Sequence, residues 1–270
     1  MAASHRAQVA RIAVAVVALA AAVCGDASVN RALAGVGRQR LAAFTASMAA
    51  PLGGRSAPGA APLLQVAQVP QARTLLGLPA AISPDGSAVD VGYRDAPTTL
   101  TLLEDYRCST TRTFERVQGA VLARLTADHE VLLRYVLESS LDERLPGPGA
   151  LLATNAARSA VAHGRFPLYH ALLFANQPPE HTDGFTTERL LGIASAVPGL
   201  RGPAFDSEVS GVRHRDWVAR SQSAYDRLHP AFGTPTLLID GQMVDMGAHP
   251  ELLEQPAALE SFVRSAAHRG

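Results

Sequence analysis

Lysine is absent from this 270-residue sequence, and cysteine is scarce. All 24 cationic side chains are arginines, and the only two cysteines are Cys24 and Cys108. Without lysine the chain can perform no Schiff-base chemistry and has no phosphate-binding loop ending in Gly-Lys-Ser/Thr. Two cysteines are too few for a disulfide scaffold or a cysteine-rich structural zinc site. The fold must therefore be stabilised by burial of apolar groups.

The sequence also has no net charge and few aromatic residues. Its 24 acidic residues balance the 24 basic ones, and aromatic residues make up 5% of the chain. Such a chain exerts no long-range attraction on nucleic acid, so we predict no nucleic-acid partner. Hydrophobic residues nevertheless make up 47% of the sequence, which indicates a globular protein and not a disordered one.

The amino-terminal residues have the order of a secretory signal. Arg6 and Arg11 precede an apolar run at 12–23, and Cys24 follows it directly. We predict a signal peptide or signal anchor at 1–29, because the run is shorter than the roughly 20 residues that a spanning helix needs. Cys24 also stands where bacterial lipoproteins carry their lipid. Cleavage, anchoring and lipid attachment stay open, and each predicts an extracytoplasmic protein, secreted or tethered to the bacterial cell membrane.

The rest of the chain divides into a tether and one ordered domain. Residues 30–84 are rich in Ala, Gly and Pro and are predicted to be a tether of low order. Residues 85–270 alternate strand and helix patterns, with an all-α insertion at about 150–230. The predicted elements are strands at 89–93 and 98–106, a helix after Cys108, a strand at 131–137, helices from 151 to 229, strands at 236–239 and 242–245, and a helix at 256–267. The fold class is therefore α/β, with the order βαβ, helical insertion, ββα.

Several segments of this domain match a known family. They are Asp95-Ala96-Pro97-Thr98, Glu104-Asp105-Tyr106-Arg107-Cys108, the helical segment from Phe166 to Gln177, and Gly233-Thr234-Pro235-Thr236. With the order of elements, they make the sequence resemble the DsbA-like disulfide oxidoreductases of bacteria over most of 89–269. The resemblance implies a thioredoxin fold with its insertion between the second and third core strands, and an active site at Cys108.

The sequence departs from that family at the active site. The family uses two cysteines at the helix start: the first forms a mixed disulfide and the second resolves it. Cys108 matches the first, but Thr111 stands in place of the second, so the usual CxxC motif is altered to Cys-Ser-Thr-Thr. Cys108 can then form a mixed disulfide, but the helix start cannot hold an internal disulfide. The departure predicts a monothiol protein or a redox-silent one.

The residues around Cys108 favour a reactive thiol. The positive end of a helix stabilises a thiolate, and the Thr111 hydroxyl is placed to donate a hydrogen bond to the sulfur. Arg107 would add to this effect, whereas an inward-pointing Glu104 would oppose it. The opposite interpretation is that Cys108 is an inert, buried side chain and that the Ser-Thr-Thr sequence is ordinary helix capping.

A second part of the site is implied by the resemblance. It predicts that the Thr234–Pro235 peptide bond is cis and lies beside Cys108, where backbone groups of Thr234 pair with an extended substrate chain. Without the resemblance, the same residues would be a turn into a strand. The partners expected from this site are exported polypeptides that carry thiols or disulfides, with the membrane contacted through the amino-terminal segment.

Other chemistry lacks support in the sequence. His163, His170 and His181 lack metal-ligand spacing, and no HExxH, GxSxG or GxGxxG motif is present. We therefore predict no metal site and no cofactor. The leading hypothesis is monothiol thiol–disulfide exchange through Cys108. The alternatives are a redox-silent peptide-binding or chaperone-like module on the same fold, and a structural component of an envelope complex.

Overall fold

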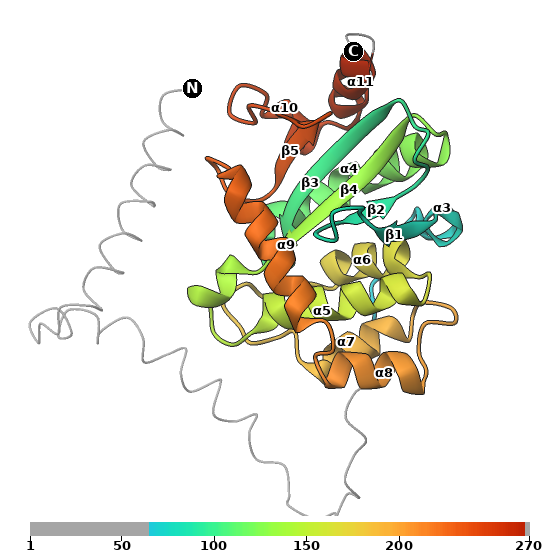
Figure 1. Cartoon of the computed structure of the whole chain (residues 1–270), viewed down its shortest axis with the longest axis vertical. Helices are drawn as coiled ribbons and strands as arrows, with labels where there is room; N and C mark the ends of the chain where they lie inside the picture. Colours follow the sequence, from blue (N-terminus) through green and yellow to red (C-terminus); the bar gives the residue numbers. More distant parts are fainter. Residues whose placement is uncertain (1–64, 268–270) are drawn as a thin grey trace, which may run out of the picture. The chain divides into compact units, whose positions relative to one another are not determined.

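A computed structural model describes residues 65–267 of the chain (Figure 1). The predicted signal or anchor at 1–29, with Cys24, lies outside these residues, as does most of the predicted tether. Within residues 65–267, no helix is sufficiently long and apolar to cross a membrane.

The centre of the domain is a six-stranded mixed sheet with the order β1-β2-β4-β3-β5-β6. β3 and β4 form its parallel core, with Thr98 opposite Val131 and Asp105 opposite Glu138, and β5 pairs antiparallel with β3. The strands are β1 (Ala80–Ile82), β2 (Val89–Val91), β3 (Thr98–Asp105), β4 (Val131–Glu138), β5 (Thr236–Ile239) and β6 (Gln242–Met243). This is the predicted thioredoxin-type order, extended by β1 and β2 at one edge.

Helices cover both faces of this sheet (Figure 1), with α4 on one face and α9 on the other. The helices are α3 (Ala72–Gly77), α4 (Ser109–Ala127), α5 (Gly149–Ala162), α6 (Phe166–Ala175), α7 (Thr187–Ala194), α8 (Pro203–Ser210), α9 (Arg215–Leu228), α10 (Glu251–Glu254) and α11 (Pro256–Ala267), with a 3-10 turn, η2 (Ser140–Glu143). Because both faces are covered, β3 and β4 are almost continuously buried, and their sequences are apolar runs instead of alternating patterns.

Most predicted elements are confirmed. α11 and β5 have the predicted bounds, 256–267 and 236–239. Thr186 caps α7 by accepting a hydrogen bond from the Arg189 amide, and the β5–β6 turn has left-handed backbone at Asp240 (φ 48°) and Gly241 (φ 81°). The beginning of the ordered domain differs, because α3 and β1 lie within the predicted tether at 30–84. β1 is a partly exposed edge strand of three residues, so its sequence shows no clear period.

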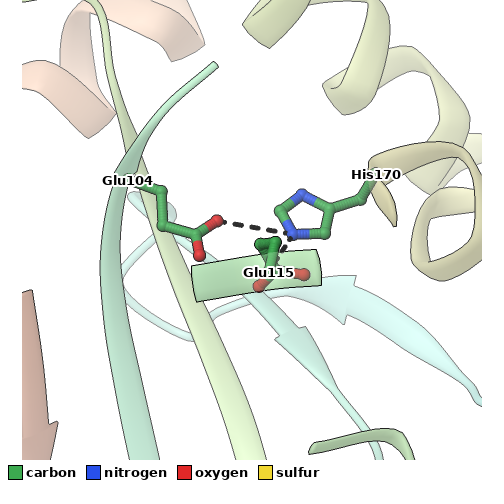
Figure 2. A group of neighbouring side chains, drawn as sticks. All are labelled: Glu104, Glu115 and His170. Carbon is green, nitrogen blue, oxygen red and sulfur yellow. Dashed lines mark ion pairs between the residues drawn. The ribbon is translucent and has the colours of Figure 1, made fainter. Parts of the chain in front are cut away.

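The main hydrophobic core lies around β3, β4, α4 and α6. Its largest buried members include Phe114 of α4 and Phe166 and Phe174 of α6. Three polar side chains interrupt this core. Figure 2 shows them pointing toward one another from three elements: Glu104 of β3, Glu115 of α4 and His170 of α6.

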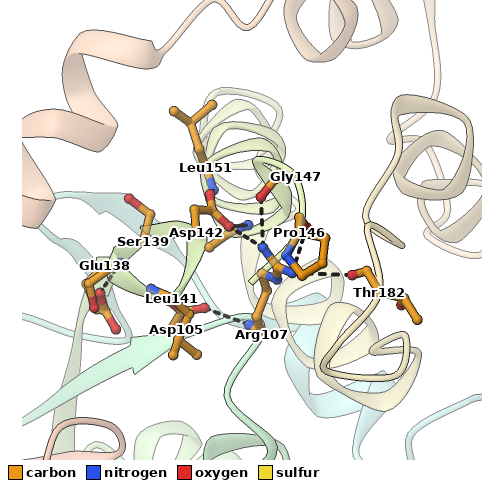
Figure 3. Close-up of polar contacts among 12 residues, drawn as sticks. Asp105, Arg107, Glu138, Ser139, Leu141, Asp142, Pro146, Gly147, Leu151 and Thr182 are labelled. Atoms are coloured by element: carbon orange, nitrogen blue, oxygen red, sulfur yellow. Dashed lines mark hydrogen bonds and ion pairs between the residues drawn. The ribbon is translucent and has the colours of Figure 1, made fainter. Parts of the chain in front are cut away.

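A buried arginine ties the end of β3 to the helical insertion (Figure 3). Arg107 is 3% exposed, and its guanidinium donates hydrogen bonds to Asp142 Oδ1 (2.7 Å) and to the carbonyls of Pro146 (2.9 Å), Gly147 (2.9 Å) and Thr182 (3.3 Å). A guanidinium satisfies such a set because its five donors lie in one plane. This one side chain therefore holds η2 and the loops before α5 and α7 in place.

Asp105, two residues before Arg107, continues this polar network. The Asp105 carboxylate accepts hydrogen bonds from the Arg107 amide (2.7 Å) and the Leu141 amide (3.3 Å). Burial, followed by the charge of neighbouring Glu138, raises the pKa of Asp105 well above its usual range. Backbone amide donors thus partly offset the cost of burying this acid at the end of β3.

We expect Arg107→Ala to lower the free energy of unfolding by about 3 kcal/mol, because it leaves Asp142 and several carbonyls without their buried donor. Urea denaturation measures this loss. Arg264→Ala is the matched control, since Arg264 makes a 2.7 Å pair with Glu130 but is 46% exposed, and its loss should cost less than about 1 kcal/mol. Equal losses in the two variants would contradict the assigned role of Arg107.

Candidate active site

Cys108 is the amino-terminal cap of α4, directly before its first residue. It has extended backbone angles (φ −72°, ψ 120°), and its carbonyl accepts the first helical hydrogen bond from the Arg112 amide at 3.0 Å. The side chain is a free, half-buried thiol. The sulfur therefore lies at the positive end of a 19-residue helix, where unpaired amides and the helix dipole stabilise a thiolate.

The loop before β5 lies against this sulfur. The Thr234–Pro235 peptide bond is cis, as the resemblance predicts, and the Cys108 thiol is 3.2 Å from the Thr234 carbonyl oxygen that accepts its hydrogen bond. These residues are 126 positions apart in sequence. They meet because β5 pairs with β3, with Thr236 opposite Leu103, near the end of β3 that leads to Cys108.

Gln177, directly after α6, holds the segment before the helix. Its side-chain amide donates hydrogen bonds to the Tyr106 carbonyl (2.7 Å) and the Cys108 carbonyl (3.0 Å), and the residue is 8% exposed. We did not predict this positioning role. The available signal was its place at the end of the family-like segment from Phe166, but only the fold shows which backbone groups it contacts.

Thr111 lies one turn into α4, where the resolving cysteine of the family would stand. It is fully buried, and among residues 65–267 its hydroxyl has no hydrogen-bond partner. The hydrogen bond expected from this hydroxyl to the Cys108 sulfur is therefore not among the described contacts. Thr111 fills the position sterically and leaves a buried polar atom unsatisfied.

Arg107 and Glu104 are the charged residues expected to influence the Cys108 thiol. The expectation for Arg107 is not met: its guanidinium is engaged with Asp142 and the surrounding loops, so it does not supply the thiol with a direct positive partner. Glu104 does point inward and is fully buried. Burial raises the pKa of Glu104 well above its ordinary value, and the charges of Glu115 and, to a smaller extent, Cys108 raise it further.

His170 lies beside two buried acids, Glu104 and Glu115, in the hydrophobic core (Figure 2). Its Nε2 lies 3.4 Å from Glu104 Oε2 and 3.8 Å from Glu115 Oε1, while its Nδ1 lies 2.8 Å from the Tyr106 hydroxyl. The sequence predicts no metal ligand at His170, because the histidines of the helical block lack metal-ligand spacing. Here the fold brings together one side chain from a strand and one from each of two helices, close enough to hold a metal ion.

We expect Thr111→Val to raise the free energy of unfolding by about 1 kcal/mol, because it replaces an unsatisfied buried hydroxyl with a methyl group of similar shape. Urea denaturation measures the change. Thr113→Val is the control: Thr113 is exposed, and its change should stay within about 0.5 kcal/mol. A loss of stability in Thr111→Val would instead show that the hydroxyl has a partner, such as the Cys108 sulfur.

Comparisons with known proteins agree with this fold. The model of a family described as thioredoxin matches residues 85–256. Among solved structures, the reduced disulfide bond oxidoreductase DsbG from Mycobacterium tuberculosis is 22% identical, with a TM-score of 0.56 over 68% of this chain and 88% of that one. BdbD from Bacillus subtilis is 16% identical, with a TM-score of 0.56 over 71% and 98% of the two chains.

DsbA from Mycobacterium tuberculosis is 19% identical, with a TM-score of 0.52 over 67% of this chain and 99% of that one. The comparison with curated proteins found no match. Because the thioredoxin model covers most of the described domain, and the fold is shared with DsbA-like oxidoreductases, the chain belongs to the thioredoxin family.

Proposed function

We propose that this protein carries out thiol–disulfide exchange with exported polypeptides through Cys108 alone. One observation carries the proposal: the Cys108 thiol stands at the start of α4, 3.2 Å from the carbonyl that precedes cis-Pro235. A helix start favours the thiolate, and the thiolate is the nucleophile of disulfide exchange. Cys108 is a free thiol and only half-buried, which supports access by a substrate disulfide.

The exchange balances without a second cysteine in the protein. The Cys108 thiolate attacks one sulfur of a substrate disulfide, the substrate S–S bond breaks, and the departing substrate sulfur takes up a proton as a thiol. A different thiolate of the same substrate then attacks the mixed disulfide, forms a new substrate disulfide and releases Cys108. The substrate is rearranged with no net oxidation or reduction, so the reaction is an isomerisation and needs no external oxidant.

The loop from Phe232 to Pro235 supports binding of the substrate chain. An extended polypeptide beside the loop would pair with backbone groups of Thr234, as in other cases of strand addition. Phe232, the first residue of this loop, is 73% exposed and offers an apolar contact to such a chain. Backbone pairing does not depend on the side chains of the substrate, so this site suits many substrates that share only an accessible disulfide.

The cellular location belongs to the same proposal. A charged and apolar segment at 1–29 supports export, and Cys24 supports tethering to the bacterial membrane through a lipid. Disulfides persist in oxidising compartments outside the cytoplasm, where a disulfide isomerase finds its substrates. The mass of the mature amino terminus distinguishes cleavage, anchoring and lipid attachment.

A redox-silent peptide-binding module is the second candidate. Two observations favour it: the large exposed Phe232 beside the loop, and Thr111 in place of a resolving cysteine. Such a module would use the same loop and the same apolar contact but would form no covalent bond. The role of the Cys108 sulfur therefore separates the two functions.

We expect the protein to form a covalent adduct with a disulfide-containing peptide, and Cys108→Ser to abolish that adduct, because a hydroxyl cannot form a mixed disulfide. Mass spectrometry of the intact protein measures the adduct, and isomerisation of a scrambled disulfide protein measures turnover. Cys24→Ser is the matched control and should retain both. If Cys108→Ser binds the peptide and assists folding as well as the unchanged protein does, the redox-silent module is the correct function.

We expect Thr111→Cys to create oxidase activity, because it restores a pair of thiols one turn apart at the helix start. The pair, once oxidised, transfers its disulfide to a reduced substrate: the substrate dithiol is oxidised and the protein dithiol is formed. Oxidation of a reduced model peptide measures this gain. Thr113→Cys, at an exposed position of the same helix, is the control and should show no gain. Equal activity in the two variants would contradict a pairing specific to the helix start.

A further inference from the structure

Glu104, Glu115 and His170 form a polar cluster that the proposed exchange reaction does not use. Their exposed fractions are 0%, 6% and 2%. Among the contacts of residues 65–267, both oxygens of Glu104, Oε1 of Glu115 and Nε2 of His170 have no hydrogen-bond partner. Buried polar atoms are nearly always satisfied, so four such atoms facing one another indicate a missing ligand.

The charge of the cluster points to a cation. Two carboxylates in an apolar core repel each other and are costly to bury unless they are paired or coordinate a metal. The imidazole beside them is enclosed by Tyr135, Phe166 and Phe174, with ring centroids 4.4, 5.1 and 5.2 Å from its own, and these rings supply no positive charge. A divalent cation would neutralise both acids and accept the Nε2 lone pair.

The distances fit a small tetrahedral ion. Ligand atoms bound about 2.1 Å from a tetrahedral zinc ion lie about 3.4 Å from one another. His170 Nε2 is 3.4 Å from Glu104 Oε2 and 3.8 Å from Glu115 Oε1, and the three ligand atoms lie within 4.8 Å of one another. Binding therefore requires the Glu115 carboxylate to move toward the other two ligands. Glu115 also lines an open cavity of about 370 Å³.

The surroundings supply the remaining parts of a metal site. An inner cavity of about 10 Å³ lined by Glu115 and His170 has the volume of about one water molecule, which would complete the coordination. The Tyr106 hydroxyl, 2.8 Å from Nδ1, would accept a hydrogen bond from the protonated Nδ1 and leave Nε2 free for the metal. Such outer partners orient histidine ligands in known metal sites.

We propose that Glu104, Glu115 and His170 bind one divalent transition-metal ion of the zinc type, with a water molecule as the fourth ligand. The site lies on β3, α4 and α6, so its ligands are held by regular elements and not by loops. Imidazole and carboxylate ligands together favour zinc over magnesium or calcium, which prefer sites made of oxygen alone.

The test is titration of the full chain, freed of metal by a chelator, with Zn²⁺ in a calorimeter. We expect one ion per chain, and Glu104→Gln and Glu115→Gln should each weaken binding by more than the roughly 10- to 100-fold that loss of an outer partner typically costs. Glu208→Gln is the matched control. Glu208 Oε2 lies 3.4 Å from His163 Nε2 and 3.7 Å from His214 Nε2, but at a partly exposed position, and this variant should bind as the unchanged protein does.

Two further measurements keep the outcome decisive. Zn²⁺ should raise the melting temperature of the unchanged protein and of Glu208→Gln but not that of Glu104→Gln, whose fold is checked by circular dichroism. Co²⁺ in place of zinc should give a visible spectrum without a sulfur-to-metal band, which excludes Cys108 as the ligand. Absence of stoichiometric binding, or binding lost in Glu208→Gln and kept in Glu104→Gln, overturns the proposal and leaves the acids sharing a proton beside His170.

Discussion

The pairing of β3 with β5 is the contact on which the rest of the site depends. β3 is a central strand, bonded to β4 on one side and to β5 on the other. Its end leads within three residues to Cys108, and the start of β5 follows directly after cis-Pro235. The register of these two strands therefore brings a thiol and a carbonyl within hydrogen-bond distance, although more than a hundred residues separate them in sequence.

The residues that follow the last leucine of β3 lie in different surroundings. Glu104 enters the core beside α4 and α6, Asp105 faces Glu138 and accepts a hydrogen bond from the Leu141 amide of η2, and Arg107 reaches the loops of the helical insertion. Each polar group is buried and each depends on a different part of the fold. The insertion is therefore joined to the Cys108 end of the sheet by polar contacts as well as by apolar packing. Gln177 makes one more such polar contact, because its side-chain amide donates a hydrogen bond to the Cys108 carbonyl.

Much of the fold was predictable because its elements carry strong local signals. The apolar run of β3, the periodic face of α4 and the Asp240-Gly241 turn are each determined by residues near in sequence. Elements without such signals were missed: β1 is a short edge strand, and α10 is a single turn. Of the candidate site, Cys108 and the Thr234–Pro235 loop were found through resemblance. The expected hydrogen bond from Thr111 to the sulfur is not among the contacts, because the direction of a hydroxyl depends on packing and not on spacing.

The sequence by itself determined the class of the protein: a thioredoxin-type order of strands and helices, with a single cysteine at the start of the first core helix. These features depend on local periodicity and on the identity of residues within short segments. Only the tertiary structure decided which side chains meet. Glu104, Glu115 and His170 are far apart in the chain and follow no ligand spacing, yet a strand and two helices bring them together. The physical reason is that packing of elements, and not spacing along the chain, determines the neighbours of a buried side chain.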